Sequence, residues 1–292
     1  MGREERIKVF ENTRYLYETD EYLKSAVKES RQNQKIVLEN SDEITGMAGI
    51  MGTTAVGEVN GNLHPEIVVS RKRTLEAAIP YARQGLRVAV HNFASATNPG
   101  GGVQNGAGAQ EECLCRCSTL FPCLNSKPVW DGFYSPHRNA HDPINNGDII
   151  CTPDVVVFKT DTDLPETMPK EDWYTVDVIT CAAPNLREKP SNSYNPGNGD
   201  SKISMSDEEL EQIHIKRLTG IFNVAGSQGC DVLILGAFGC GAFRNPPEFA
   251  AKAAKAVVEK FGHRFKVIEF AVYCRPDDDT NYRIFEKVLG KR

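Results

Sequence analysis

Short apolar runs that alternate with longer amphipathic segments are the feature that most restricts the fold of this chain. The runs are typical of buried β-strands and occur at residues 67–69, 87–90, 155–158, 176–179, 231–235 and 267–273. Segments with helical periodicity lie among them, at residues 74–83, 110–123, 207–225, 246–261 and 281–289. Apolar strands that alternate with helices predict an α/β layer fold with a largely parallel or mixed sheet.

The first part of the chain does not follow this pattern. Residues 3–33 are rich in Glu, Lys, Arg and Tyr, and their apolar positions predict one or two exposed helices. Residues 125–148 and 187–205 are rich in Asn, Pro, Ser and Gly, and we predict that both are long surface loops. Because no repeat or linker interrupts the chain, we expect one structural unit. It has a helical N-terminal extension over residues 1–60, packed on an α/β domain over residues 61–292.

Charge and composition exclude several classes of protein. The chain has 34 Lys and Arg against 39 Asp and Glu, and a net charge of −5 does not attract nucleic acids or acidic membranes in general. No apolar run approaches the roughly 20 residues that span a bilayer, and the charged first residues do not resemble a secretory signal. Nine cysteines, four of them within residues 113–123, are typical of reduced thiols in a cytoplasmic protein.

A glycine-rich loop follows the predicted strand at residues 87–90. It contains Gly100, Gly101 and Gly102, and it leads into the helix predicted to begin near Gln110. Without Cβ atoms the backbone can approach a ligand closely, and N–H groups beside a helix start suit a phosphate or diphosphate. The alternative is a flexible turn with no ligand.

Two acidic residues, Glu111 and Glu112, lie in the first turn of that helix. At about 100° per residue they fall off the face that we expect to be buried. The buried face comprises Gln110, Cys113, Leu114, Cys117, Leu120, Phe121 and Leu124. The pair could simply complement the helix dipole. Alternatively, two adjacent acids near a diphosphate would raise the pKa of one of them, which would suit a general acid that breaks a glycosidic bond.

A second glycine-rich loop follows the strand at residues 231–235. It contains Gly239, Cys240, Gly241, Ala242 and Phe243, and a helix follows. Phe238 occupies the position of the second glycine in a dinucleotide fingerprint, and no P-loop Lys follows. The loop is therefore another kind of phosphate loop or a tight turn. Phe243 could pack against a ribose or belong to the core.

These residues together resemble one family. The three glycines, followed after seven residues by Gln110–Glu111–Glu112, resemble the GGG and QEE signature of poly(ADP-ribose) glycohydrolases. Residues 74–78, 92–96, 98–99, 182–185 and 239–243 are similar to the microbial branch. The resemblance covers about residues 10–290, and the loop at 239–243 also resembles macrodomains that bind ADP-ribose.

The resemblance implies a fold, a ligand and an activity. The fold is a macrodomain-like three-layer α/β/α structure with a mixed sheet and a helical N-terminal extension. ADP-ribose would lie across both glycine loops, with its diphosphate between them. The activity would be hydrolysis of ribose–ribose O-glycosidic bonds in poly(ADP-ribose), which releases ADP-ribose and requires no cofactor and no metal.

The resemblance also implies roles for individual residues. Glu112 would be the general acid/base, and Glu111 would orient the ribose hydroxyls. Asn98 would bind the distal ribose, and Phe243 would press it into a reactive position. The other implied substrate-binding residues are Gly100, Gly101, Gly102, Val103, Gln110, Gly239, Cys240, Gly241 and Ala242. Val103 departs from the family, in which a Phe follows the third glycine, and this puts loop closure and chain-length preference in doubt.

Several alternatives stay open. The chain could remove single ADP-ribose units from proteins, or it could be a non-catalytic ADP-ribose reader, although a reader needs no acid pair. The expected partners are ADP-ribose, poly(ADP-ribose) or ADP-ribosylated proteins, with no direct nucleic-acid or membrane contact. Zinc binding by the cysteines of residues 113–123 is disfavoured, because Cys115 would point away from Cys113 and Cys117. A further hypothesis is that Tyr134 covers an adenine.

Overall fold

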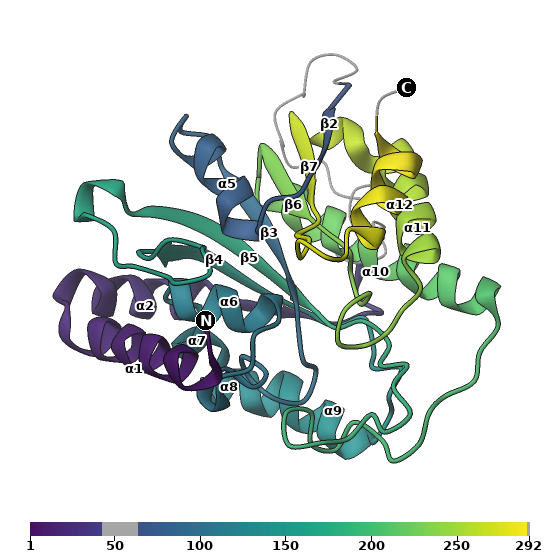
Figure 1. Ribbon diagram of the computed structural model, residues 1–292, viewed down its shortest axis with the longest axis horizontal. Coiled ribbons are helices and arrows are strands. Elements are labelled where there is room, and N and C mark those ends of the chain that lie inside the picture. Colours follow the sequence, from purple (N-terminus) through teal and green to yellow (C-terminus); the bar gives the residue numbers. More distant parts are fainter. Residues whose placement is uncertain (43–63, 291–292) are drawn as a thin grey trace.

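The predicted α/β layers are present in the structure, a computed structural model that describes residues 1–42 and 64–290. Seven strands form one mixed sheet (Figure 1). In spatial order they are β1 (Lys35–Val37), β4 (Ile149–Val157), β5 (Tyr174–Cys181), β3 (Val88–Phe93), β6 (Val232–Leu235), β7 (Val267–Ala271) and β2 (Glu66–Ser70).

The central part of the sheet is parallel. Strands β5, β3, β6, β7 and β2 run in one direction, and β1 and β4 pair in antiparallel fashion at one end. Strands β3 and β6 are direct neighbours, with Val88 opposite Val232 and Val90 opposite Ile234. The loops that follow these two strands therefore leave the same edge of the sheet. In open α/β sheets this edge is where ligands bind.

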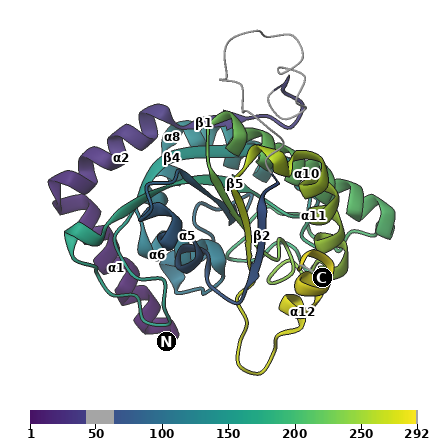
Figure 2. The same ribbon diagram turned by 90° about the horizontal axis from the view of Figure 1, so that it is seen from above.

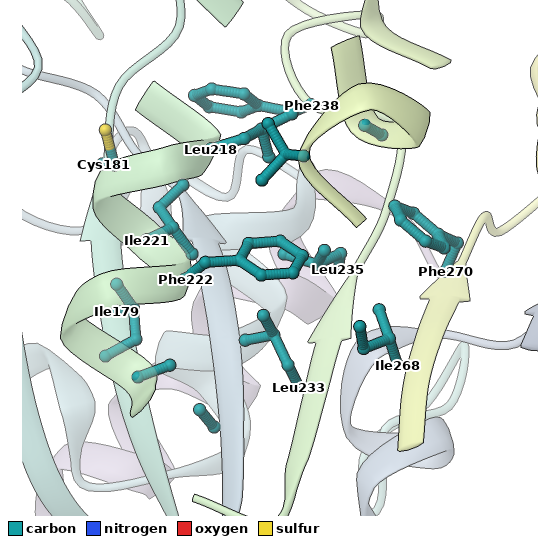
Figure 3. Close-up of a cluster of buried hydrophobic side chains, with 14 of the residues drawn as sticks. Ile179, Cys181, Leu218, Ile221, Phe222, Leu233, Leu235, Phe238, Ile268 and Phe270 are labelled. Atoms are coloured by element: carbon teal, nitrogen blue, oxygen red, sulfur yellow. The ribbon is translucent and has the colours of Figure 1, made fainter. Parts of the chain in front are cut away.

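Helices cover both faces of the sheet, as Figures 1 and 2 show. One layer consists of α10 (Asp207–Ser227), α11 (Pro247–Phe261) and α12 (Thr280–Leu289). Its core contains Phe222 of α10 against Leu233 and Ile268 of the sheet (Figure 3). The residues that alternate with them along the strands, such as Ile234, belong to the core on the opposite face.

The second layer contains α5 (Thr74–Ala82), α6 (Gln110–Cys117) and α7 (Leu120–Leu124). Leu75 of α5 and Leu114 of α6 pack there against Val90 and Val178 of the sheet. The structure is therefore the three-layer α/β/α arrangement that we expected. None of its described helices is both long enough and apolar enough to span a membrane.

The predicted N-terminal helices are α1 (Arg3–Thr19) and α2 (Glu21–Asn33). They are separated at Asp20, whose carboxylate caps α2 by accepting hydrogen bonds from Tyr22 N and Leu23 N. Phe10 of α1 is buried, with its ring edge-on to Phe121 of α7 at 5.0 Å. The predicted boundary at residues 60 and 61 lies outside the described residues, so the division into extension and domain stays a prediction.

The prediction of one helix over residues 110–123 is wrong in one respect, because the helix is interrupted between α6 and α7. Ser118 forms a β-bridge with Val157, and Thr119 N donates to Val156 O at 3.0 Å. The backbone at the break therefore bonds to the end of β4 instead of continuing the helix.

The loop predicted over residues 125–148 is also partly wrong. It contains α8 (Lys127–Val129), a π-helical turn η2 (Trp130–Tyr134) and α9 (Ser135–Ala140). Phe133, Tyr134 and His137 are all buried, and this burial stabilises helical structure in a segment whose Pro and Asn content indicated a loop. Because Tyr134 has no exposed surface, it does not cover an adenine in this structure. Residues 187–205 form no helix or strand, as predicted.

The core around Phe222 provides a test of the fold. Phe222 has no exposed surface, so Phe222→Ala should lower the free energy of unfolding by about 3–5 kcal/mol, through lost burial and the cavity left behind. Urea unfolding followed by circular dichroism measures this loss. The matched control is Tyr15→Ala on α1, because Tyr15 is 63% exposed and its loss should change stability by no more than about 0.5 kcal/mol. Equal effects of the two substitutions would contradict the described core.

Candidate active site

The first glycine loop connects β3 to α6 and depends on two unusual backbone conformations. Gly100 and Gly101 have φ angles of 66° and 55°, in the left-handed region that favours glycine. A Cβ atom on Gly101 would lie 2.5 Å from Glu112 Oε1 and 3.2 Å from Glu111 Oε2. Glycine is therefore required both for the turn and for the close approach of the backbone to the two carboxyl groups.

The two acids are buried, whereas we expected them to lie off the buried face. Glu111 is 3% exposed and Glu112 is 6% exposed. Glu112 Oε1 accepts a hydrogen bond from Gly102 N at 2.8 Å, and Glu112 Oε2 has no partner among the described residues. Glu111 accepts from Ser95 N at 2.8 Å and from Asn92 Nδ2 at 3.4 Å. The loop folds over the first turn of α6 and covers both side chains.

The buried environment changes the pKa of Glu111. Burial raises the pKa of Glu111 well above its usual value, and the negative charge of Glu112 raises it further. The hydrogen bonds from Ser95 and Asn92 act in the opposite direction but are the smaller effect. We expected one member of the pair to have a raised pKa, and the structure assigns that shift to Glu111.

Gln110 anchors the start of α6. Its Oε1 accepts from Phe93 N at 2.9 Å, and its Nε2 donates to His91 O at 2.8 Å and to Thr74 Oγ1 at 3.0 Å. These bonds tie α6 to β3 and α5, and so fix where Glu111 and Glu112 begin their helical turn. Gln110 also lines the cavity described below, so its predicted contact with substrate stays a prediction.

Asn98 and Val103 support the loop from within. Asn98 Nδ2 donates to Gly101 O, and Asn98 Oδ1 accepts from Arg138 at 3.4 Å. The Val103 side chain has no exposed surface and packs in the core beneath the loop. Its side chain is thus directed away from solvent, and a substrate contact by Val103 would have to involve its backbone.

The second glycine loop is held by a buried asparagine that sequence reasoning missed. Asn245 Nδ2 lies within hydrogen-bond distance of three carbonyl oxygens, those of Pro184 (2.7 Å), Gly239 (3.1 Å) and Phe243 (3.3 Å). Both ends of the predicted segment 239–243 are therefore attached to one side chain. The only signal in the sequence was a polar residue directly before two prolines.

His214 orients this asparagine. Its Nε2 lies 2.9 Å from Asn245 Oδ1, and burial lowers the pKa of His214 to about 4. The ring is therefore neutral near pH 7. Because an amide oxygen only accepts hydrogen bonds, His214 Nε2 must carry the hydrogen and donate it to Asn245. The pair fixes the orientation of the amide that holds the loop.

A cavity of about 880 Å³ lies between the second glycine loop and the start of α6. Its described lining does not include Asn98, Gly100–Gly102, Glu111 or Glu112. Phe93, Gln110 and residues 237–243 line it, which places Gly239, Cys240, Gly241, Ala242 and Phe243 together as predicted. The two predicted locations of Phe243, at a ligand site or in the core, are both partly right, because the side chain lines the cavity and also packs against the core.

Arginines line the cavity beyond the loops, namely Arg6, Arg73, Arg116 and Arg275. Asp161, Asp163 and Asp278 line the cavity as well, and Asp163 pairs with Arg73. The other arginines supply the positive charge that suits an anionic ligand.

The cysteines do not form a metal site in the described part of the chain. No group of three or more His, Cys, Asp or Glu residues is placed there to hold a metal ion. Cys115, Cys117 and Cys123 are buried, and Cys113 is half-buried with its Sγ 3.1 Å from the Arg116 guanidinium. Burial raises the pKa of the Cys113 thiol. All nine cysteines are free thiols.

Comparison with solved structures places this arrangement in a class of enzymes. A poly(ADP-ribose) glycohydrolase from Thermomonospora curvata matches with a TM-score of 0.79 and 26% identity, over 97% of this chain and 98% of that one. A structure of the Deinococcus radiodurans glycohydrolase in complex with ADP-ribose matches with a TM-score of 0.72 and 27% identity, over 90% and 96% of the chains. The Thermomonospora curvata enzyme has also been solved with the inhibitor ADP-HPD, and it matches with a TM-score of 0.77 and 25% identity, over 97% and 98%.

The sequence comparison agrees. Residues 3–160 match the family described as microbial-type PARG, catalytic domain. The chain therefore belongs to the microbial-type poly(ADP-ribose) glycohydrolase family, and its activity is hydrolysis of poly(ADP-ribose). A comparison with curated proteins found no match.

The contact between Gly101 and the acids predicts a strong effect of a single methyl group. Gly101→Ala would place a Cβ against Glu112 Oε1 and displace the carboxyl group, so we expect kcat/KM for poly(ADP-ribose) to fall by about 10²-fold. The matched control is Gly85→Ala, because Gly85 also has a positive φ of 77° but has no atom within 4 Å of the added methyl. That variant should keep its activity while carrying similar backbone strain. Equal activity of both folded variants would contradict the described packing.

The raised pKa of Glu111 predicts a pH-dependent stability. In the unfolded chain this side chain ionises near its usual value of 4.5, while in the folded protein it keeps its proton to higher pH. The folded state then binds more protons above that pH, so stability falls as pH rises. Glu111→Gln removes the group, and its stability relative to the wild type should increase as the pH rises above the usual glutamate value of 4.5. Urea unfolding at several pH values measures the difference. A difference independent of pH would show that Glu111 ionises alike in both states.

Proposed function

We propose that Glu112 is the general acid/base of this glycohydrolase and acts on the terminal ADP-ribose unit of poly(ADP-ribose). One observation carries the assignment. Glu112 Oε2 is buried beside the glycine loop and has no hydrogen-bond partner among the described residues, whereas both oxygens of Glu111 accept hydrogen bonds. A buried polar atom without a partner is unfavourable, and a ligand hydroxyl or glycosidic oxygen would satisfy it.

The proposed reaction uses the Glu112 carboxyl group twice. In the first step the bond between the anomeric carbon of the terminal ribose and the leaving oxygen breaks. The proton of Glu112 passes to that oxygen, and the ribose develops oxocarbenium character. In the second step the Glu112 carboxylate takes a proton from water, and the water oxygen bonds to the anomeric carbon. The products are ADP-ribose and a polymer shortened by one unit, with the protonated acid restored.

Glu111 supports this cycle as a neutral neighbour. A protonated Glu111 removes the repulsion between two adjacent buried carboxylates and can donate a hydrogen bond to a ribose hydroxyl. Ser95 N and Asn92 Nδ2 hold its side chain in one orientation.

The cavity and the relatives support a proposed position for the ligand. The glycine-rich second loop and the arginines on the cavity wall suit the diphosphate of ADP-ribose. The distal ribose would lie beyond this cavity, at Gly100, Gly101 and Gly102, where the Gly101 backbone approaches both acids. The Deinococcus radiodurans glycohydrolase has been solved in complex with ADP-ribose. We therefore propose ADP-ribose, poly(ADP-ribose) and ADP-ribosylated proteins as the partners of this chain. Asn98, Gln110 and Phe243 are proposed to contact the ribose and diphosphate.

The proposal is tested by Glu112→Gln. Gln keeps the size and the bond to Gly102 N but cannot transfer a proton, so kcat should fall by about 10²–10⁴-fold. Release of ADP-ribose from polymer, measured chromatographically, gives kcat, and calorimetric titration with ADP-ribose measures binding, which should persist.

Glu111→Gln is the matched comparison, because the two acids differ by one position in the same helical turn. We expect a smaller loss for this variant if Glu111 only orients the ribose. Normal turnover by Glu112→Gln together with an inactive Glu111→Gln would reverse the two roles. A parallel assay on mono-ADP-ribosylated protein separates cleavage of the polymer from removal of single units.

A further inference from the structure

Three consecutive backbone carbonyl groups of the first glycine loop each accept a hydrogen bond from a different arginine. The carbonyls belong to residues 105–107, between the three glycines and α6. The pairs are Arg3 Nε with Asn105 O (2.9 Å), Arg6 Nε with Gly106 O (2.6 Å) and an Arg116 guanidinium nitrogen with Ala107 O (2.7 Å). Arg3 and Arg6 come from α1, and Arg116 comes from α6. We name these three residues the arginine clamp.

Helix α1 lies directly against the loop backbone at this point. Gly106 has a φ of 71°, and a Cβ there would lie 2.5 Å from Arg3 O and 3.0 Å from Ile7 Cγ1. Arg6 Cζ lies 3.4 Å from the position of a Cβ on Gly108. The small residues of the loop therefore also allow the N-terminal helix to approach. Thr13 Oγ1 of α1 donates to Arg116 O at 2.6 Å, which ties the helix to α6 as well.

The clamp is electrostatically unusual. Arg116 is 1% exposed, and no carboxylate of the described residues lies within ion-pair distance of Arg3, Arg6 or Arg116. The buried carboxylate of Asp161 attracts Arg116 without a direct ion pair, so the charge of Arg116 is only partly compensated and its burial is costly. Arg6 and Arg116 both line the large cavity. The guanidinium groups of Arg6 and Arg116 therefore bind the loop carbonyls and also add positive charge to the cavity wall.

The segment held by the clamp lies between the two parts of the catalytic arrangement. Gly102, which donates to Glu112, lies on one side of it, and the helical turn that carries Glu111 and Glu112 lies on the other. We propose that Arg6 and Arg116, assisted by Arg3, are positioning residues for hydrolysis. They hold the loop against the acids and keep the cavity wall attractive to a diphosphate. Helix α1 is then part of the catalytic machinery. This inference rests on the proposed position of the diphosphate between the loops.

Arg6→Ala tests the proposal, because Arg6 lies on a surface helix where the substitution should not prevent folding. We expect kcat/KM for poly(ADP-ribose) to fall about tenfold or more and the Kd for ADP, used as the diphosphate probe, to rise. Arg6→Lys keeps the charge and can still donate a hydrogen bond, but it lacks the planar guanidinium, so it should recover only part of both losses. At the buried position, Arg116→Lys should likewise lower kcat/KM and weaken ADP binding by less than a substitution that removes the charge.

Arg14→Ala is the matched control. Arg14 lies on the same helix, is exposed and pairs with Glu18, so its loss should leave kcat, KM and ADP binding unchanged. A folded Arg6→Ala protein with kcat/KM within about twofold of the wild type would overturn the proposal. So would a lower melting temperature with unchanged kinetic constants and ADP affinity well below that temperature, because this pattern indicates a merely structural role.

A second comparison separates this proposal from the role of Glu112. ADP binding is measured for Arg6→Ala in the Glu112→Gln background, where the same loss of affinity is expected. If Glu112→Gln is fully active while Arg6→Ala still weakens ADP binding and turnover, the assignment of Glu112 as the acid is wrong and the positioning role of the arginine clamp is supported. If the wild-type protein does not bind ADP, the proposed position of the diphosphate fails and the clamp fails with it.

Discussion

Two neighbouring carboxyl groups buried under a glycine backbone are the constraint on which the rest of the site depends. Ionised carboxylates side by side in a low dielectric repel each other strongly, so the pair is stable only when one member keeps a proton. Hydrogen bonds from Ser95 N, Gly102 N and the Asn92 amide to the two carboxyl groups offset part of the unfavourable free energy of burying them. A backbone can approach both acids only where side chains are absent. The three glycines, the two acids and Gln110 therefore form one physical unit.

The arrangement also requires two loops to leave the sheet side by side. Strands β3 and β6 are parallel neighbours, so their C-terminal ends carry the first and second glycine loops to one edge. Each loop is then held from behind by polar side chains outside the signature motifs. Asn245 and His214 hold the second loop, and Gln110 anchors the helix that follows the first. The cavity between the second loop and α6 is shaped as much by these buried supports as by the residues that face it.

Much of the fold was predictable, since the strands are short, apolar runs and the helices between them have clear periodicity. The prediction failed where tertiary contacts compete with local pattern. The helix over 110–123 breaks because Ser118 and Thr119 bond to β4, and the segment around Phe133 becomes helical because its aromatic side chains are buried. In the site, the glycines and acids were identified from sequence. The burial of Glu111 and Glu112 was not predicted, because helical periodicity gives no information about a loop that folds back over the start of the helix. The roles of Asn245 and Arg116 were not predicted, because both side chains bond to backbone carbonyl groups, and the sequence does not show which carbonyls a folded chain brings near them.

The pairing of β2 has a consequence for how the protein is made. Among the described strands, β2 (residues 66–70) bonds only to β7 (residues 267–271), so nearly the whole domain separates the two partners. At translation rates of roughly 5–20 residues per second, β2 has no partner for roughly 10–40 s while the intervening chain is synthesised. During that time its apolar run, Ile67 to Val69, is a free template for pairing with other chains. The sheet is completed only when one of the last elements leaves the ribosome. Nascent chains stalled before residue 267 therefore keep this edge unpaired, and they are more exposed to aggregation and to chaperones than the completed chain.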